Sequence, residues 1–245
     1  MSKVEILKFD IWGETATFTI PIKNDKKYTN MHIHKPCILG ILGGIIGIVE
    51  DTNIKDAEPN YQKELKNLLI SIVPKKPTFS KFIDSKTNTT GCFNKGDTYV
   101  NEIEMLLRPC WEVYVKNDNS NEYKKIKEFL LNGKSYIRPY LGTNWNFADI
   151  NNIDVLEGME TDLEDEEKID SLFPINDNFQ YGDETYYFEE HMPIQYECIE
   201  LRNEKDKKIK QWQYNYVNMC LTDGEIYSKN SVDLIKCNSK SLYFI

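Results

Sequence analysis

The segment that most constrains the fold of this 245-residue chain is an apolar, glycine-rich stretch from Cys37 to Val49. It follows Pro36 and comprises 13 residues, four of which are glycines. A membrane span needs about 20 apolar residues, so the stretch instead predicts a buried helix that proline opens and that ends near Glu50. Each glycine costs a helix about 1 kcal/mol relative to alanine. The four glycines therefore indicate that something packs very close to the helix backbone.

The pattern of apolar residues elsewhere predicts an α+β fold. Short runs rich in apolar and β-branched residues are typical of strands. We expect strands at 4–12, 15–22, 68–73, 103–115 and 153–156. Helical spacing from Glu122 to Leu131 ends at Asn132-Gly133, a common helix stop. The core order is then β-α-β-β-α-β, which is the ferredoxin-like arrangement.

Two regions are expected outside this core. A lysine-rich stretch around Asn88-Thr-Thr-Gly91 predicts a long β-hairpin, or thumb, near 75–98. Residues 157–170 hold eight acidic side chains and are expected to form a solvated loop, followed by a small antiparallel sheet. We therefore divide the chain into a ferredoxin-like domain at 1–160, which includes the thumb, and an acidic, β-rich region at 161–245.

The charge is distributed unevenly along the chain. The chain has 30 basic and 39 acidic residues, a net charge of −9, which argues against a general polyanion binder. Residues 1–150 hold 21 basic and 18 acidic side chains, whereas residues 151–245 hold 9 and 21. A basic groove for nucleic acid in the first part is compatible with this distribution. Only three of the cations are arginines, so phosphate contacts are expected to be loose and salt-sensitive.

Several site motifs are incomplete. Gly133-Lys134-Ser135 lacks the first glycine of a phosphate loop, and the glycines after Leu42 lack the first glycine of a dinucleotide fingerprint. His32, His34 and Cys37 have no fourth zinc ligand nearby, so we expect no metal and no cofactor. The six cysteines form no CxxC pair and the first residues are charged. These features predict reduced thiols in a cytoplasmic protein.

The stretch from Trp12 to Gly47 combines three features that suit a phosphate backbone. It contains aromatic rings for stacking, a group of cations (Lys23, Lys26, Lys27, His34 and Lys35), and a helix start followed by glycines. Unpaired N–H groups at a helix start favour anions. The same residues also fit a structural interpretation, in which the glycines allow tight packing and the lysines solvate a loop.

The order and spacing of two motif groups favour the first interpretation. The first group is Phe9-Asp-Ile-Trp-Gly13, Ala16-Thr-Phe18 and the glycine-rich stretch Lys35–Gly47. The second is Gly133–Gly142, which reads Gly-Lys-Ser-Tyr-Ile-Arg-Pro-Tyr-Leu-Gly. Together they resemble CRISPR-associated Cas family five, a branch of the RAMP superfamily, and the type I-B members look closest. The resemblance covers roughly residues 3–150.

The resemblance implies an RRM-like core whose function in antiviral defence is to cap the 5′ handle of CRISPR guide RNA. The partners it implies are the backbone and large subunits of a type I Cascade complex, with target DNA met only indirectly and no membrane. The residues expected to bind RNA come from strand one, the first helix with its preceding loop, the thumb and the second motif. They are Trp12, Lys27, Tyr28, His34, Lys35, Gly40, Gly43, Gly44, Lys81, Lys86, Arg108, Lys134, Arg138 and Tyr140.

Two other functions stay open. In type I-C systems the resembling protein is a metal-independent endoribonuclease with a tyrosine and a Lys-His pair, whose places fall here at Ile46 and Asn121-Glu122. We therefore expect a non-catalytic protein, and the alternative is a ribonuclease that uses His32 or His34 with Tyr28. The third function is binding of sugars or another protein by the aromatic residues near the carboxyl end. These are Tyr186, Tyr187, Trp212, Tyr214 and Tyr216.

Overall fold

A computed structural model describes most of the chain and shows a mixed α+β fold made mainly of strands. The described residues are 2–21, 26–50, 58–88, 99–162, 168–175, 179–181, 187–202, 208–224, 226–228 and 232–245. The central element is a six-stranded antiparallel sheet with the order β15-β14-β8-β1-β7-β4. Its strands are β1 (Lys3–Trp12), β4 (Ile70–Pro74), β7 (Cys110–Lys116), β8 (Asp149–Asp162), β14 (Asp233–Cys237) and β15 (Lys240–Leu242).

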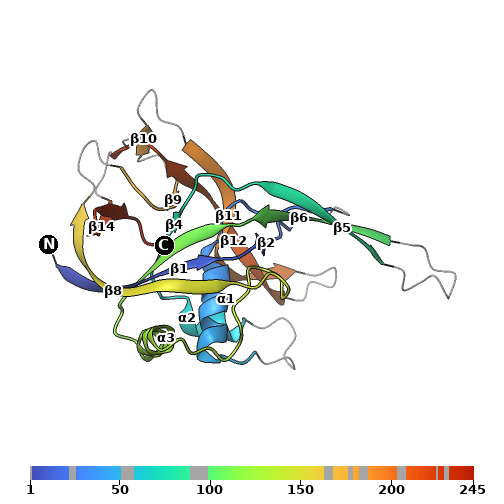
Figure 1. The fold of residues 1–245 in the computed structure, drawn as a ribbon, viewed down its shortest axis with the longest axis horizontal. Helices are drawn as coiled ribbons and strands as arrows, with labels where there is room; N and C mark the ends of the chain where they lie inside the picture. Colours follow the sequence, from blue (N-terminus) through green and yellow to red (C-terminus); the bar gives the residue numbers. More distant parts are fainter. Residues whose placement is uncertain are drawn as a thin grey trace.

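Three helices cover one face of this sheet (Figure 1). They are α1 (Lys35–Ile46), α2 (Asn60–Leu65) and α3 (Asn121–Leu131). Alternate residues of β1, such as Phe9 and Ile11, point to this face and join Leu39 and Leu42 of α1 in the main hydrophobic core. Trp12 belongs to the other series of β1 residues and therefore lies on the face turned away from α1.

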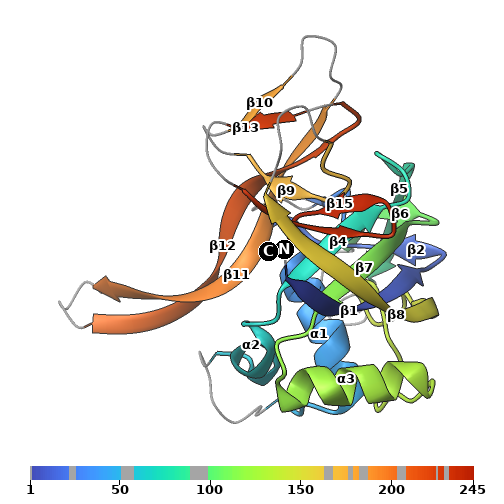
Figure 2. The ribbon, with the colours of Figure 1, turned by 90° about the vertical axis from the view of Figure 1, so that its left-hand side faces the viewer.

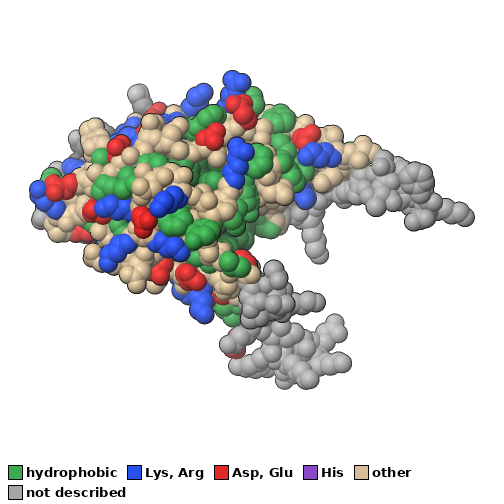
Figure 3. Space-filling view, turned by 60° about the horizontal axis from the view of Figure 1, so that its bottom comes forward, with side chains coloured by type: hydrophobic (Ala, Val, Ile, Leu, Met, Phe, Trp, Pro, Cys, Tyr) green, Lys and Arg blue, Asp and Glu red, His purple; other side chains and the backbone are tan. Residues whose placement is uncertain are grey.

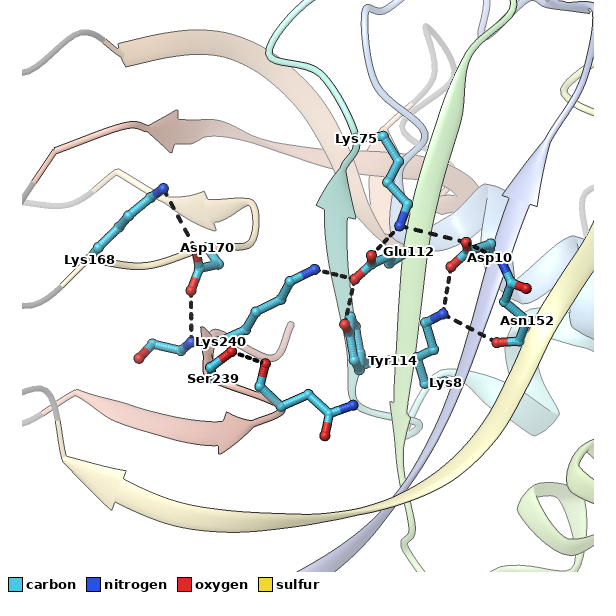
Figure 4. Close-up of polar contacts among 12 residues, drawn as sticks. Lys8, Asp10, Lys75, Glu112, Tyr114, Asn152, Lys168, Asp170, Ser239 and Lys240 are labelled. Carbon is cyan, nitrogen blue, oxygen red and sulfur yellow. Dashed lines mark hydrogen bonds and ion pairs between the residues drawn. The ribbon is translucent and has the colours of Figure 1, made fainter.

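That other face carries a network of ion pairs (Figure 4). Lys8 Nζ lies 2.8 Å from Asp10 Oδ1, and Lys75 contacts both Asp10 and Glu112. Lys240 and the Tyr114 hydroxyl also donate to Glu112. Burial alone would raise the pKa of Glu112, but these hydrogen bonds lower it to about 2. Carboxylates from the sheet itself therefore engage these three lysines.

A second, smaller sheet is built around the predicted thumb. The hairpin strands are β5 (Lys81–Asn88) and β6 (Tyr99–Leu107), and β6 also pairs with β2 (Thr15–Ala16) and β3 (Lys26–Lys27). The tip of the predicted thumb lies outside the described residues. The expected continuous strand at 103–115 is wrong, because Arg108 adopts φ 47° and Pro109 follows it, so the chain turns between β6 and β7. The strand expected at 15–22 is reduced to β2 because Thr17–Ile20 contact residues 28–30 and 141 instead.

The acidic run is only partly a loop. Residues 157–162 continue β8, and 159–162 pair with β14, where Ile235 faces Glu160, so the expected loop is wrong for this part. Gly158 is buried against Ile6 and Ile235, while its neighbours Glu157 and Met159 are exposed. Residues 163–167 lie outside the described part.

The carboxyl-terminal region contains a long two-stranded arm, formed by β11 (Tyr187–Arg202) and β12 (Lys208–Thr222). Figure 2 shows the arm curving away from the body of the protein. The short strands β9 (Phe173–Pro174), β10 (Phe179–Tyr181) and β13 (Ile226–Ser228) complete this region. Because β14 and β15 extend the central sheet, the sheet continues across the boundary expected near residue 160. None of the helices in the described residues is long and apolar enough to cross a membrane.

Candidate nucleic-acid interface

A cavity of about 440 Å³ lies where α1, the loop at 137–142 and the arm meet. Each of these three elements forms one wall and supplies at least two lining residues. Those considered below are Gly40 and Gly44 from α1, Arg138 and Tyr140 from the loop, and Tyr214 and Tyr216 from β12. The volume is in the range typical of sites for small ligands, about 300–1,000 Å³. The α1 wall of the cavity thus includes helix backbone at two glycines, and the other two walls include aromatic rings and one guanidinium.

The start of α1 is set by His34 and Pro36. His34 is the N-cap, and its Nδ1 accepts a hydrogen bond from the Cys37 N–H at 3.3 Å. Burial lowers the pKa of His34 to about 3, so the ring is neutral at physiological pH. Since Nδ1 accepts, the ring proton is on Nε2. His34 therefore lines the cavity as a neutral hydrogen-bond donor.

The glycines of α1 have two different surroundings. A Cβ atom on Gly43 would lie 2.8 Å from Cβ of Tyr61, so this glycine is needed for close packing of α2. Gly47 ends the helix at φ 80° and packs under the ring of Tyr136. Gly40 and Gly44 have only ordinary contacts, at 3.8 Å and 3.7 Å for an added Cβ. The predicted close approach is confirmed at Gly43 and Gly47, and the other two glycines face the cavity.

The second motif group lies directly against the first. The N–H groups of Tyr136 and Ile137 donate to carbonyl oxygens of α1, at 3.0 Å and 3.2 Å. The Thr17 N–H donates to the Leu141 carbonyl at 3.1 Å. Gly142 has φ 85°, and an added Cβ would lie 1.7 Å from the Thr17 carbonyl oxygen, so only glycine fits there. Two motifs about 120 residues apart in the sequence thus build two adjoining walls of the cavity.

Two cation–aromatic pairs involve exposed rings that follow the loop at 137–142 in the chain. The guanidinium of Arg138 lies 4.1 Å from the ring centre of Phe147, and Lys86 Nζ lies 4.4 Å from the ring centre of Trp145. Trp145 and Phe147 are each about half exposed, at 48% and 49%. Each of these half-exposed rings therefore has a cation over its face. Figure 3 shows hydrophobic side chains gathered at the hollowed part of one face, with charged side chains interspersed over the rest.

The structure brings five of the predicted RNA-binding residues together at the cavity, namely His34, Gly40, Gly44, Arg138 and Tyr140. Lys86 is not among the lining residues; it lies over Trp145 and pairs with Asp84 at 3.2 Å. Our sequence reasoning missed Trp145 and Phe147. Their only signal was the alternation of aromatic side chains after Arg138, which we did not use.

The other predicted residues lie elsewhere or have other partners. Lys81 donates to the Thr29 carbonyl and pairs with Glu104, Arg108 pairs with Glu14, and Lys134 pairs with Glu128. Lys27 is exposed on β3. Tyr28 follows β3, and Lys26 Nζ lies 5.3 Å from the centre of the Tyr28 ring. Lys35 is partly buried at the start of α1, and burial lowers its pKa to about 8. Gly43 is covered by Tyr61, and Trp12 lies on the far side of the central sheet.

His32 does not face the cavity. Its Nδ1 accepts from Trp111 Nε1–H at 3.3 Å, and its Nε2–H donates to the Pro77 carbonyl at 2.9 Å. Burial lowers the pKa of His32 to about 4, so the ring is a neutral part of the core. Within the described residues, no group of three or more His, Cys, Asp or Glu side chains could hold a metal ion.

No family model and no curated protein sequence matches this chain. Solved structures do, at low sequence identity. A chain of a CRISPR RNA-guided surveillance complex superposes with a TM-score of 0.52 at 11% identity, over 93% of this chain and 92% of that one. A CRISPR protein from Archaeoglobus fulgidus is 11% identical, with a TM-score of 0.45 over 98% of each chain. This protein therefore has the fold of a subunit of an RNA-guided CRISPR complex.

Proposed function

We propose that this protein is a non-catalytic, RNA-binding subunit of a type I CRISPR Cascade complex. In this role it holds the 5′ handle of the guide RNA and contacts the backbone and large subunits in the cytoplasm. The observation that carries the proposal is the cavity, which joins bare α1 backbone, Arg138 and exposed rings on a fold shared with an RNA-guided complex. The motifs at 9–47 and 133–142 support assignment to Cas family five, with type I-B as the closest branch.

We also propose that the core is ferredoxin-like. The strands β8-β1-β7-β4 are neighbours in the central sheet and all pair antiparallel. In the chain, α1 lies between β1 and β4, and α3 lies between β7 and β8. These features match the order and the two helical connections of a β-α-β-β-α-β core. The thumb is then an insertion between β4 and β7.

The histidines that could serve in a ribonuclease have surroundings that favour a binding role over catalysis. His32 has both ring nitrogens engaged in the core, and His34 caps α1 with Nδ1. Burial lowers the pKa of both rings well below neutrality, so neither is poised to exchange protons near pH 7. Ile46 is buried and apolar where the type I-C enzymes place a tyrosine.

Binding of a 5′-labelled, repeat-derived RNA by the full chain tests this function. We expect wild-type protein to bind the RNA and leave it intact, both with magnesium and with EDTA. Arg138→Ala should weaken binding about 10- to 100-fold, the usual effect of losing a contact to a charged group. It should also lower the slope of log affinity against log salt by about 0.7, as expected for one lost phosphate contact on a single strand.

Lys124→Ala is the matched control, because it removes one positive charge from the exposed surface of α3. Its affinity should stay within about twofold of wild type. Equal losses in both variants would show that only general charge matters and would contradict the proposed site. Shortened RNA in either buffer would favour the ribonuclease instead.

A further inference from the structure

The arm carries a continuous row of aromatic side chains, which we call the aromatic row. Trp212, Tyr214 and Tyr216 alternate along β12 and so share one face, and Tyr196 of β11 lies directly opposite Tyr214. The ring centre of Tyr196 lies 6.0 Å from that of Trp212 and 4.7 Å from that of Tyr214. The ring centres of Tyr214 and Tyr216 lie 6.4 Å apart. Each of these side chains is only partly buried. The row therefore presents linked rings along the arm.

The aromatic row begins inside the cavity. Tyr214 and Tyr216 line the cavity, and the Tyr214 ring centre lies 6.5 Å from that of His34. A hydrogen bond joins the hydroxyl groups of Tyr214 and Tyr61 of α2 and ties this end of the row to the body. From there the row follows the arm, which curves away from the central sheet (Figure 2). A nucleic-acid chain that leaves the cavity along β12 would contact Tyr196 and Trp212 next.

The chemistry of the aromatic row favours stacking over charge. No lysine or arginine occurs at 193–198 or 211–217, where the row is built. Directly opposite Trp212 lies Cys198, which is exposed and uncharged. Flat rings accept any base because every base has a π face, and they need no phosphate contact to do so. The cations of the candidate interface, such as Arg138, are instead at the cavity.

We propose that the aromatic row stacks unpaired bases of a single-stranded RNA segment that continues from the cavity onto the arm. This inference rests on the proposed RNA-binding function and adds a second contact region with a different chemistry. The cavity end contributes charge and hydrogen bonds, and the arm contributes base stacking. Continuity of the rings with the cavity favours RNA as the occupant over another protein.

The test compares two double variants of the full chain with the same repeat-derived RNA. Tyr196→Leu with Trp212→Leu keeps apolar bulk on the arm but removes two flat rings. Gln211→Ala with Gln213→Ala changes exposed residues on the opposite face of the same strand and is the control. We expect the leucine variant to lose about 10- to 100-fold in affinity, the effect of losing base–aromatic stacking. Its salt slope should equal that of wild type, unlike the slope of Arg138→Ala.

A second measurement uses the wild-type protein and requires no substitution. Alkylation of Cys198 by a maleimide, followed by mass spectrometry, reports access to the face that carries the aromatic row. Saturating RNA should slow this alkylation at least several-fold. A lack of protection, or leucine variants that bind RNA as wild type does, overturns the proposal.

The outcomes separate this inference from the proposed function. If Arg138→Ala weakens binding and the leucine variant does not, the function stands and the arm proposal falls. If the leucine variant binds RNA normally but no longer assembles with Cascade subunits, the aromatic row is a protein-docking surface and the proposal is overturned. If wild-type protein has no RNA affinity, with or without partner subunits, both proposals fall.

Discussion

The His34 ring is held between two other rings while it caps α1. Its centre lies 5.9 Å from that of Phe18 and 6.5 Å from that of Tyr214, and its Nδ1 accepts from the Cys37 N–H. A protonated ring would lose the cap and would place a charge in the core. This explains why burial lowers the pKa of His34 to about 3. His34 thus links the stability of the site to pH.

We predict that His34→Asn makes stability less dependent on pH. In wild type the folded pKa lies below the unfolded value of about 6.5, so the stabilising contribution is present above pH 6.5 and is lost as the pH falls toward 3. Asparagine is a good N-cap and does not titrate. Urea unfolding between pH 6 and pH 4 should show a slope smaller by up to about 1.4 kcal/mol per pH unit.

Ser120→Asn, at the N-cap of α3, is the control for this change. It replaces one capping residue with another, and its pH slope should match that of wild type. An unchanged slope in His34→Asn would mean that the histidine is protonated to the same extent in the folded and unfolded states. That result would contradict the buried, neutral ring described above.

At the scale of elements, α1 is a helix whose glycines divide between packing and the cavity. We predict opposite effects on stability for two neighbouring substitutions. Gly43→Ala places a methyl group 2.8 Å from Tyr61 Cβ and should destabilise the fold by about 1–3 kcal/mol. Gly44→Ala meets only Ile137, at 3.7 Å, and should raise the free energy of unfolding by up to about 1 kcal/mol.

The two glycine variants are also expected to differ in RNA affinity. The methyl group of Gly44→Ala enters the cavity, so RNA affinity should fall although the protein is at least as stable as wild type. Urea unfolding and RNA titration of the same preparations provide both readouts. Equal destabilisation by the two variants, or full affinity in Gly44→Ala, would show that these glycines serve packing alone.

Local signals predicted the helices much better than the strands. Pro36 marks the start of α1 and Asn132-Gly133 follows α3, as expected, whereas α1 ends at Ile46 with Gly47 as its cap rather than near Glu50. The six-residue helix α2 has no comparable signal and was missed. The strand β8 extends to Asp162 because β14, more than 70 residues later, pairs with its acidic end. Such pairing with distant segments leaves no local pattern in the sequence.

At the scale of the whole molecule, the net charge of −9 is compatible with RNA binding because the lysines have different environments. Three of them, Lys8, Lys75 and Lys240, pair with carboxylates on the outer face of the central sheet (Figure 4). These three lysines share two carboxylates, Asp10 and Glu112, whereas the Arg138 side chain on the helix side is exposed and packs on Phe147. The candidate interface therefore depends on a few cations and on aromatic surface rather than on a broad basic patch.

Only part of the candidate site could be predicted from the sequence. The two motif groups pointed to α1 and to the loop at 137–142, which form two walls of the cavity, and their role in RNA binding stays a prediction. The third wall, formed by Tyr214 and Tyr216, belongs to a region that we expected to be separate. Only the folded arm brings those rings to α1, and no local pattern in the sequence encodes that contact.

Photo-crosslinking of a guide RNA with 4-thiouridine placed through its 5′ handle tests the central claim most directly. Mass spectrometry of the crosslinked full chain identifies the peptides that touch RNA. The cavity account predicts crosslinks to the segment at 134–147 and to the start of α1, with further crosslinks at Tyr196 and Trp212 on the arm. Crosslinks confined to the outer face of the central sheet, around Lys8, Lys75 and Lys240, would contradict it.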